Sequence, residues 1–235
     1  MFKFSNPKRF QELSDNVYPW INFLAFVFIL IGLYYSFFNS PPDYLQGETV
    51  RIMYIHVPSA WLSLMIYSSM GICSIISLIW KHTLADIISR SCAPIGASFT
   101  LVTLITGSIW GKPTWGTWWV WDARLTSELI LLFIYLGHII LSNAFDDFRK
   151  GDRNASILAI VGLINLPIIK WSVDWWNTLH QPASINILSK SSIHISMLFP
   201  LITMTAAFAL FSLLIFLMKY NTELIKIKNK GLDRL

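Results

Sequence analysis

Six long apolar segments constrain this chain more than any other feature. They fall at about 18–38, 58–80, 92–110, 126–145, 155–173 and 196–218. Each has about the 20 residues that an α-helix needs to cross the hydrocarbon core of a bilayer. Inside a bilayer the backbone finds no water, so its polar groups must bond within the segment, as they do in a helix. The sequence therefore predicts an all-α integral membrane protein, a bundle of six transmembrane helices.

The composition supports the same class. Of the 235 residues 54% are hydrophobic and 13% are charged, whereas a soluble domain carries roughly 25% charged residues. The net charge of +5 does not indicate nucleic-acid binding, because no basic stripe accompanies it. With no repeat or soluble domain visible, we expect one membrane domain over 1–235. The first segment has no cleavage site after it, so we interpret it as an uncleaved span.

The basic residues predict which side of the membrane each loop faces. Six spans place both termini on one side, and most of the 18 lysines and arginines fall there. The opposite side holds only Arg51, Lys112, Arg124, Lys170 and Lys190. The positive-inside rule then places both termini in the cytoplasm. Three loops, at about 39–57, 111–125 and 174–195, are predicted to lie outside.

Tryptophan is concentrated in the middle one of these outer loops. The stretch WGKPTWGTWWVWDARLTSE, residues 110–128, places five of the eleven tryptophans within twelve residues. An ordinary belt of interfacial aromatic residues spreads over both faces of the membrane. The loops 81–91 and 146–154, by contrast, contain no tryptophan. A specialised aromatic surface is therefore favoured, with an exaggerated belt as the alternative.

This loop has the residues to form a flat apolar shelf. Gly111, Pro113 and Gly116 interrupt regular structure. Trp115, Trp118 and Trp119 would share a face if the middle of the loop is a short helix. Such a shelf at the membrane boundary is suited to a large planar aromatic ligand that stacks on it.

Two histidines reach the same outer side from other parts of the chain. His56 stands in MYIHVPSAW, just before the second span, and His180 stands in WWNTLHQP, in the third outer loop. Imidazole is a standard axial ligand of haem iron. Arg124, Lys112 or Arg51 is available to pair with carboxylates at the edge of a ligand. Haem fits the shelf, the histidines and the cations together, although each histidine alone also fits a structural role at headgroup level.

The other histidines and the cysteines fit ordinary roles. His82 falls in a cytoplasmic loop, and His194 begins the last span on the outer side. His138 lies near the middle of the fourth span, where a polar side chain usually has a partner or a function. Cys73 and Cys92 form no CxxC motif or Cys/His cluster that would indicate zinc or redox chemistry. We interpret them as small packing residues.

Three stretches of the sequence together resemble a known family. WGKPTWGTWWVWDARLTSELILLF is similar to the tryptophan-rich WWD signature of haem-handling membrane proteins. YIHVPSAW before it and NLPIIKWSVDWWNTLHQP after it narrow the resemblance to the CcmC family, six-span proteins of system I cytochrome c maturation. The resemblance covers nearly the whole chain. The larger WWD relatives, CcmF and the system II proteins, have many more spans than 235 residues allow.

The resemblance implies a function and a site. CcmC-type proteins hold haem b as transferred cargo on an outer, periplasmic WWD segment, here 110–128, between two axial histidines that correspond to His56 and His180. The residues assigned to the haem ring and its edge are Trp110, Trp115, Trp118, Trp119, Trp121, Asp122 and Arg124. The implied partners are the haem chaperone CcmE, the ATP-driven pair CcmA and CcmB, and the small membrane protein CcmD. The implied location is the bacterial inner membrane, and the role is haem export and transfer without catalysis.

Three other classes of protein fit the sequence less well. A carrier resembling cytochrome b needs histidine pairs within facing spans, and only His138 lies deep. A permease would show broken helices and polar groups near the midplane, whereas these spans read as nearly free of charge. An enzyme lacks a nucleophile–base pair here, and we interpret Asp122 and Glu128 as partners of Arg124 or helix caps. Haem could reach the outer face sideways from the membrane or through CcmA and CcmB.

Overall fold

The structure is a computed structural model, and it describes residues 7–180 and 193–232. Its elements are α1 (Pro7–Tyr34), η1 (Tyr35–Asn39), η2 (Glu48–Ile52), α2 (Met53–Trp80), α3 (Thr83–Trp115), α4 (Ala123–Asn143), α5 (Phe148–Gly162), α6 (Asn165–Trp175) and α7 (Ile195–Leu232). Six helical runs are long and apolar enough to span a membrane. These runs are Arg9–Asn39, Glu48–Trp80, Thr83–Trp115, Ala123–Asn143, Phe148–Trp175 and Ile195–Asn229. The predicted all-α, six-span fold is confirmed.

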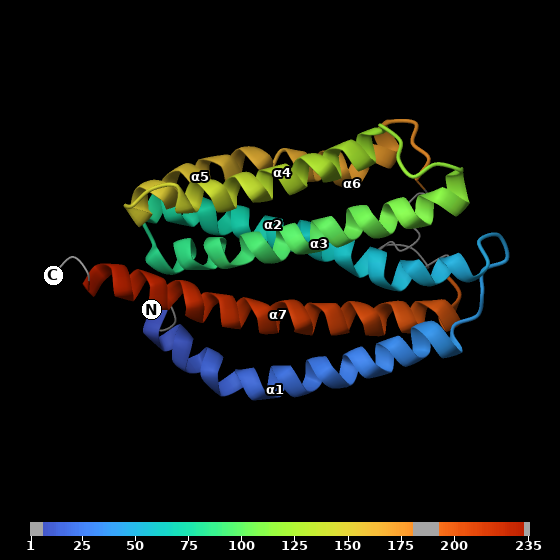
Figure 1. Cartoon of the computed structure of the whole chain (residues 1–235), viewed down its shortest axis with the longest axis horizontal. Coiled ribbons are helices and arrows are strands. Elements are labelled where there is room, and N and C mark those ends of the chain that lie inside the picture. The colour runs from blue at the N-terminus through green and yellow to red at the C-terminus, as the bar shows by residue number, and fades with distance from the viewer. Residues whose placement is uncertain (1–6, 181–192, 233–235) are drawn as a thin grey trace.

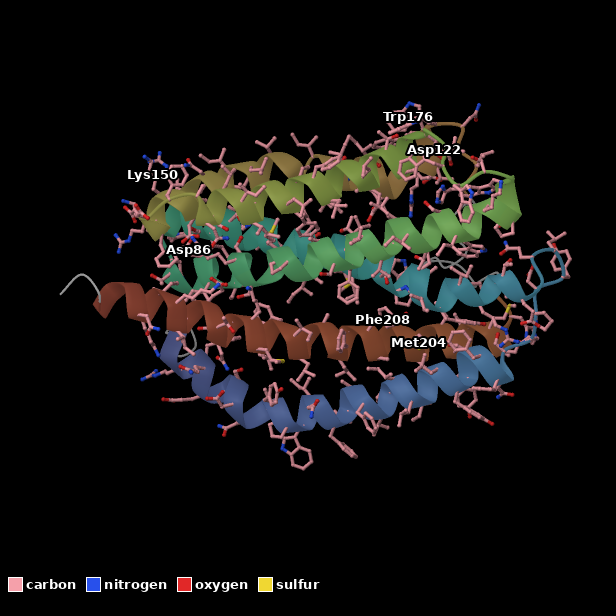
Figure 2. The ribbon with its side chains drawn as sticks, viewed as in Figure 1. Asp86, Asp122, Lys150, Trp176, Met204 and Phe208 are labelled. Atoms are coloured by element: carbon pink, nitrogen blue, oxygen red, sulfur yellow. The ribbon has the colours of Figure 1, made fainter. Side chains whose placement is uncertain are left out.

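The helices pack side by side as three pairs (Figure 1). Helix α1 packs chiefly on α7, α2 packs on α3, and α4 packs on α5. Both termini lie at one end of the bundle, together with the α2–α3 and α4–α5 turns (Figure 1). The loops after η1 and α3 lie at the opposite end, as do the residues 176–180 that follow α6. We call these the inner end and the outer end, and Figure 2 shows Asp86 and Lys150 at the inner end and Asp122 and Trp176 at the outer end.

Buried tyrosines hold α2, α3, α4 and α5 together near the middle of the bundle. Tyr67 and Tyr135 are fully buried, and their rings meet edge to face at 5.0 Å. The Tyr67 hydroxyl donates to the Ala159 carbonyl at 2.9 Å, and the Tyr135 hydroxyl donates to the Ser63 carbonyl at 2.7 Å. A side chain at Gly96 would strike the Tyr135 ring. These contacts fix the helices whose outer ends carry the candidate histidines and tryptophans.

The second helix begins earlier than the hydropathy pattern predicts. Helix α2 starts at Met53, directly after the 3₁₀ turn η2. Pro58, the first residue of the predicted span 58–80, therefore lies inside the helix. His56, expected just before the span, lies on the helix itself. The charged residues Glu48 and Arg51 lower the hydropathy of this stretch although they sit on a helical turn at the outer end, so the pattern misses the true start.

The tryptophan segment does not contain the expected short helix. Instead, α3 continues as far as Trp115 and ends at Gly116, whose φ of +77° is a left-handed conformation that suits glycine. The Gly116 N–H donates to the Lys112 carbonyl at 3.1 Å and closes the last turn. Trp118 and Trp119 follow in an irregular bend. The three tryptophans therefore do not share one helical face.

Each of the six apolar windows holds at most two charged residues, in agreement with the expectation that the spans are nearly free of charge. Four charged residues are nevertheless buried within the longer helices: Arg90, Glu128, Asp152 and Glu223. The hydropathy pattern places Arg90 in a loop because it starts the third span at residue 92, whereas α3 begins at Thr83. Buried charges in membrane helices are costly unless they are paired, so each of these residues requires an explanation in terms of its neighbours.

The fifth span is also broken. Helix α5 ends at Gly162 and α6 begins at Asn165, with a turn between them. The Asn165 side chain donates to the Ser127 carbonyl of α4 at 2.8 Å. A break at membrane depth is tolerated where neighbouring helices satisfy the freed polar groups. Helix α6 then leads from this break to the third outer loop.

Candidate functional site

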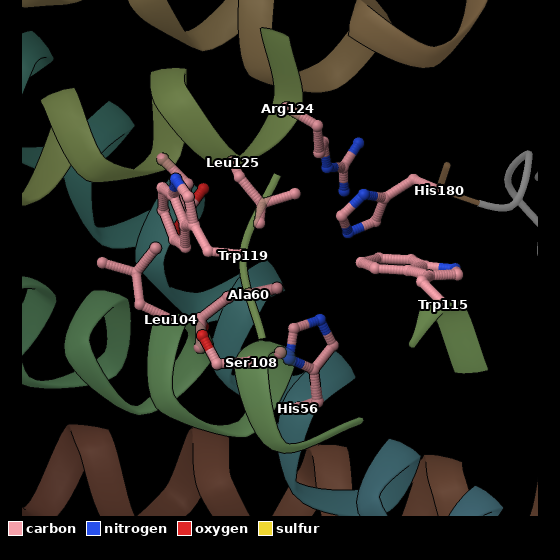
Figure 3. Close-up of a pocket in the computed structure, with 12 residues that line it drawn as sticks. His56, Ala60, Leu104, Ser108, Trp115, Trp119, Arg124, Leu125 and His180 are labelled. Atoms are coloured by element: carbon pink, nitrogen blue, oxygen red, sulfur yellow. The ribbon is translucent and has the colours of Figure 1, made fainter. Parts of the chain in front are cut away.

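A pocket lies at the outer end between α2, α3 and α4 (Figure 3). Its empty volume is about 430 Å³, including the part that opens to the outside. Its lining consists of His56, Ala60, Thr103, Leu104, Gly107, Ser108, Trp115, Trp119, Arg124, Leu125, Glu128 and His180. The fold thus brings residues more than 100 positions apart in the sequence to one cavity.

His56 is held on α2 by a defined hydrogen bond. Its Nδ1 lies 3.0 Å from the Thr106 hydroxyl, which itself donates to the Val102 carbonyl at 2.6 Å. Because that hydroxyl has only one proton to donate, it accepts from His56, and this assigns the imidazole proton to Nδ1. The Nε2 atom is then the bare nitrogen that can bind a metal.

Two neighbours shape the space around the His56 ring. The ring meets Trp110 edge to face, with 5.7 Å between the ring centres. On another side lies Gly107, where an added Cβ would stand 3.1 Å from His56 Cε1. That distance is tighter than an ordinary carbon–carbon contact. Glycine at this position therefore leaves room for the imidazole.

His180 reaches the pocket from the segment that follows α6. Its ring packs on Trp115, with 4.8 Å between ring centres (Figure 3). Its Nδ1 lies 3.7 Å from Asp122 Oδ2. Burial, together with the nearby Arg124 guanidinium, lowers the pKa of His180 to about 4. The imidazole is therefore neutral at neutral pH, which is the form that binds metals.

The five predicted tryptophans take up three different positions. Trp115 and Trp119 line the pocket, and the buried Trp119 Nε1 has no hydrogen-bond partner among the described residues. Trp118 is 57% exposed and Trp121 is 75% exposed. Trp110 lies behind His56 and donates from Nε1 to the Gln46 side chain at 2.9 Å. The structure therefore brings two of the five to the cavity itself.

Asp122 and Arg124 both lie at the start of α4. Asp122 is the N-cap, because its Oδ1 accepts from the Leu125 N–H at 2.8 Å, and this confirms the predicted cap. Arg124 is half-buried and lines the pocket (Figure 3). It donates from Nη1 to the Ile169 carbonyl at 3.0 Å, and the described residues offer it no other hydrogen bond. The rest of the guanidinium is available to an anionic group of a ligand.

Glu128 is a pocket residue that sequence reasoning did not assign to the site. It is buried, lines the cavity one helical turn after Arg124, and accepts from the Ser63 hydroxyl at 3.0 Å. Its position inside a span, one turn from an arginine, was the available signal. Thr106 and Gly107 carried no signal in the sequence, because their importance comes only from contact with His56.

The other candidate cations lie outside the pocket. Lys112 is exposed and donates to the Gly116 carbonyl at 3.0 Å. Arg51 pairs with Glu48 and donates to the backbone carbonyls of Ser36 and Phe37 in η1. Of the three cations expected at the edge of a ligand, only Arg124 lines the cavity.

Two further histidines also lie elsewhere. His138 is buried in α4, and its Nε2 lies 3.1 Å from the Ser89 hydroxyl. His194 is exposed at the start of α7, where its Nδ1 lies 2.8 Å from the Ser196 hydroxyl. Neither residue lines the pocket.

The chain is similar to a known protein family along almost its whole length. The family described as CcmC, heme exporter protein C, matches residues 1–234. The heme exporter protein C of Bradyrhizobium diazoefficiens is 49% identical over 229 residues, covering 97% of this chain and 87% of the relative. The protein of the same name from Haemophilus influenzae is 46% identical, with 95% and 91% covered. A putative cytochrome c biosynthesis ccmC-like mitochondrial protein of Marchantia polymorpha is 54% identical over 178 residues, with 76% and 75% covered.

Proposed function

The chain belongs to the CcmC family of heme exporter proteins, and from this premise we propose that it binds haem b at its outer end and passes it on for cytochrome c maturation. Haem is the cargo in this proposal rather than a permanent cofactor. The observation that carries it is the convergence of His56 and His180, from separate parts of the chain, on one pocket with Trp115, Trp119 and Arg124. A shared ligand explains why both positions are histidine.

The chemistry of the pocket fits haem in three respects. His56 Nδ1 is hydrogen-bonded to Thr106, and His180 Nδ1 faces the Asp122 carboxylate at 3.7 Å, so Nε2 of each ring is the nitrogen left for the iron. The ring of Trp119 offers an apolar face and a buried Nε1–H without a partner among the described residues. Arg124 has guanidinium donors to spare for a propionate. The two histidines fix the iron, the tryptophans cover the ring, and the arginine fixes its edge.

We further propose that the outer end faces the periplasm and that both termini face the cytoplasm. The excess of lysine and arginine at the inner end supports this orientation. The family name supports assembly with an exporter, and the proposed partners are CcmA, CcmB and CcmD, with CcmE as the haem acceptor. The proposed location is the bacterial inner membrane.

The absorption spectrum of the purified protein with haem tests the proposal. Two imidazole ligands should give six-coordinate, low-spin iron. His56→Ala and His180→Ala should each open one face of the iron, change the spin state and lower haem occupancy. Free imidazole should partly restore the spectrum in either variant.

His194→Ala is the matched control, because His194 is also at the outer end but lies outside the pocket. It should leave the spectrum unchanged. Wild-type spectra in both His56→Ala and His180→Ala would show that the axial assignment is wrong.

A further inference from the structure

The Nδ1 atoms of the two pocket histidines face chemically different groups. His56 Nδ1 lies 3.0 Å from the hydroxyl of Thr106, a neutral group. His180 Nδ1 lies 3.7 Å from Oδ2 of Asp122, a carboxylate. A haem held between them would therefore have two imidazole ligands, one with a hydroxyl at its Nδ1 atom and the other with a carboxylate there.

We infer that Asp122 is a positioning residue that acts on haem through His180, and that it makes His180 the stronger of the two iron ligands. The inference rests on the proposed function, and it gives Asp122 a defined role within it. The carboxylate keeps the proton on Nδ1 and so leaves Nε2 free for the iron. His56, held by neutral acceptors, the Thr106 hydroxyl and the Thr103 backbone, is the weaker ligand and the one that haem gives up first on transfer.

The geometry around Asp122 supports this role. Its Oδ1 is fixed by the Leu125 N–H at 2.8 Å, so Oδ2 has little freedom to turn away. The Asp122 side chain is only 7% exposed, and Oδ2 and His180 Nδ1 are both buried with no hydrogen-bond partner among the described residues. The Trp115 ring packs against the imidazole and limits its movement.

The 3.7 Å separation is about 0.5 Å longer than the upper limit of an ordinary N–H···O bond. Functional hydrogen bonds are often long in the free protein and shorten when the ligand binds. A small shift of the His180 ring closes this one. Both atoms are then satisfied, and no other group described in the structure competes for either.

The carboxylate of Asp122 determines which nitrogen of His180 carries the proton. An ionised carboxylate only accepts hydrogen bonds, so it is compatible only with the tautomer of His180 that carries the proton on Nδ1. A carboxylate in this position also raises the basicity of a metal-bound imidazole. The Thr106 hydroxyl holds the same tautomer in His56, but a neutral acceptor gives a weaker bond.

The competing explanation is that Asp122 serves only as the N-cap of α4. Asn, Asp and Ser are about equally good N-caps. A cap role alone therefore predicts that Asp122→Asn and Asp122→Ser behave alike and close to wild type. The positioning role predicts that they differ, because the amide N–H₂ of Asn can donate to Nδ1 and favours the wrong tautomer, as seen for the catalytic aspartate of serine proteases.

The experiment measures haem affinity and the absorption spectrum of the full-length protein in detergent. Asp122→Ser should weaken haem binding by about tenfold, within the usual range for the loss of a carboxylate behind a metal-binding histidine. Asp122→Asn should weaken it further and raise the high-spin fraction. Thr106→Val is the matched control for His56 and should have a smaller effect. Thermal unfolding without haem should be unchanged in both Asp122 variants.

A second measurement separates a direct effect on His180 from a structural one. In a His180→Ala background at saturating haem, the difference between Asn and Ser at position 122 should vanish, whereas the Thr106→Val effect should persist. The midpoint potential of the haem should move to a more positive value in Asp122→Ser than in Thr106→Val. Loss of the stronger donor favours ferrous over ferric iron.

The outcomes separate this inference from the proposed function. A wild-type protein with two histidine ligands and an equal response to Asn and Ser at position 122 would overturn the inference alone. A difference between Asn and Ser that persists without His180 would also overturn it. A wild-type protein without the spectrum of two axial histidines would remove both the inference and the proposed function.

Discussion

Arg90 and Arg124 lie at opposite ends of the helical bundle, and the protein surrounds them differently. Arg90, on α3 at the inner end, is 3% exposed in its side chain and forms an ion pair with Asp152 of α5. It also donates to the Ser142 carbonyl and stands 4.8 Å from the centre of the Phe148 ring. The Arg90 guanidinium therefore contacts a carboxylate, a carbonyl and an aromatic face.

Arg124, at the outer end, has far fewer partners. It makes one hydrogen bond, to the Ile169 carbonyl, and no ion pair within 4.0 Å among the described residues. The carboxylates of Asp122, Glu128 and Asp174 act on it only from a greater distance. The difference teaches that burial of an arginine does not by itself indicate its role. A guanidinium paired with a carboxylate supports the fold, while one without an ion pair is available to a ligand.

Removal of Arg90 should have the largest effect of any single substitution in this comparison. Arg90→Ala would leave the Asp152 carboxylate buried without its partner, which typically costs about 3–5 kcal/mol. The free energy of unfolding, measured by denaturant titration in mixed micelles, should fall by that amount. Haem affinity of the fraction that remains folded should stay the same. A loss of stability under about 1 kcal/mol would show that the comparison overstates the role of Arg90.

Replacement of Arg124 should affect ligand binding rather than stability. Arg124→Gln removes a charged donor, and hydrogen bonds to charged groups contribute about 1.5–3 kcal/mol, which corresponds to a loss of haem affinity of roughly tenfold to a hundredfold. Haem dimethyl ester, which lacks free carboxylates, is the matched ligand and should bind wild type and variant alike. An equal loss of affinity for haem and its ester would exclude the propionate as the partner.

Gly107→Ala should have an intermediate effect confined to the outer end. The added Cβ would stand 3.1 Å from His56 Cε1 and force the imidazole off its rotamer, at a cost of about 1 kcal/mol. Haem affinity should fall roughly fivefold. Gly137→Ala is the control, because its Cβ would meet the flexible Leu158 side chain at 2.9 Å, away from the pocket. If both variants reduce haem affinity equally, crowding of His56 is not the cause.

The smallest effect should come from the exposed Trp118, which differs in this respect from its neighbour Trp119. Trp119→Ala removes a ring that lines the pocket, and stacking on such a ring is worth about 0.5–1.5 kcal/mol beyond buried area. Trp118 is 57% exposed, so Trp118→Ala should change haem affinity less. Titration of both variants with haem checks the order. A larger loss for Trp118 would mean that the bend after Gly116 rearranges on binding.

The sequence predicted the six spans well, because hydropathy over 20 residues reports directly on membrane depth. The ends of the helices were predicted less well. Charged residues such as Glu48 and Arg51 mask a helical turn at the outer end, so His56 was expected in a loop. The break between α5 and α6 was also missed, since the apolar run continues through it and the compensating bond from Asn165 to Ser127 comes from another helix.

The sequence showed the residue types of the candidate site, but it did not show which of their side chains point into the pocket. His56 and His180 share a predicted side of the membrane, and the structure brings them to one pocket; their role as iron ligands stays a prediction. Trp118 and Trp119 are adjacent in sequence, and only the bend after Gly116 decides which of them faces the cavity. Partners such as Thr106 act through a single contact made in three dimensions, which no spacing in the sequence records.

The ion pair between Arg90 and Asp152 also bears on how the chain enters the membrane during synthesis. Helix α5 is a poor span by itself, with four charged residues between positions 149 and 153. A carboxylate that is buried between helices without a partner is costly. Synthesis proceeds from the N-terminus, so α3 brings Arg90 into place before the α4–α5 hairpin delivers Asp152. Because α3 precedes α5 in the chain, Arg90 is already present when Asp152 arrives as its partner.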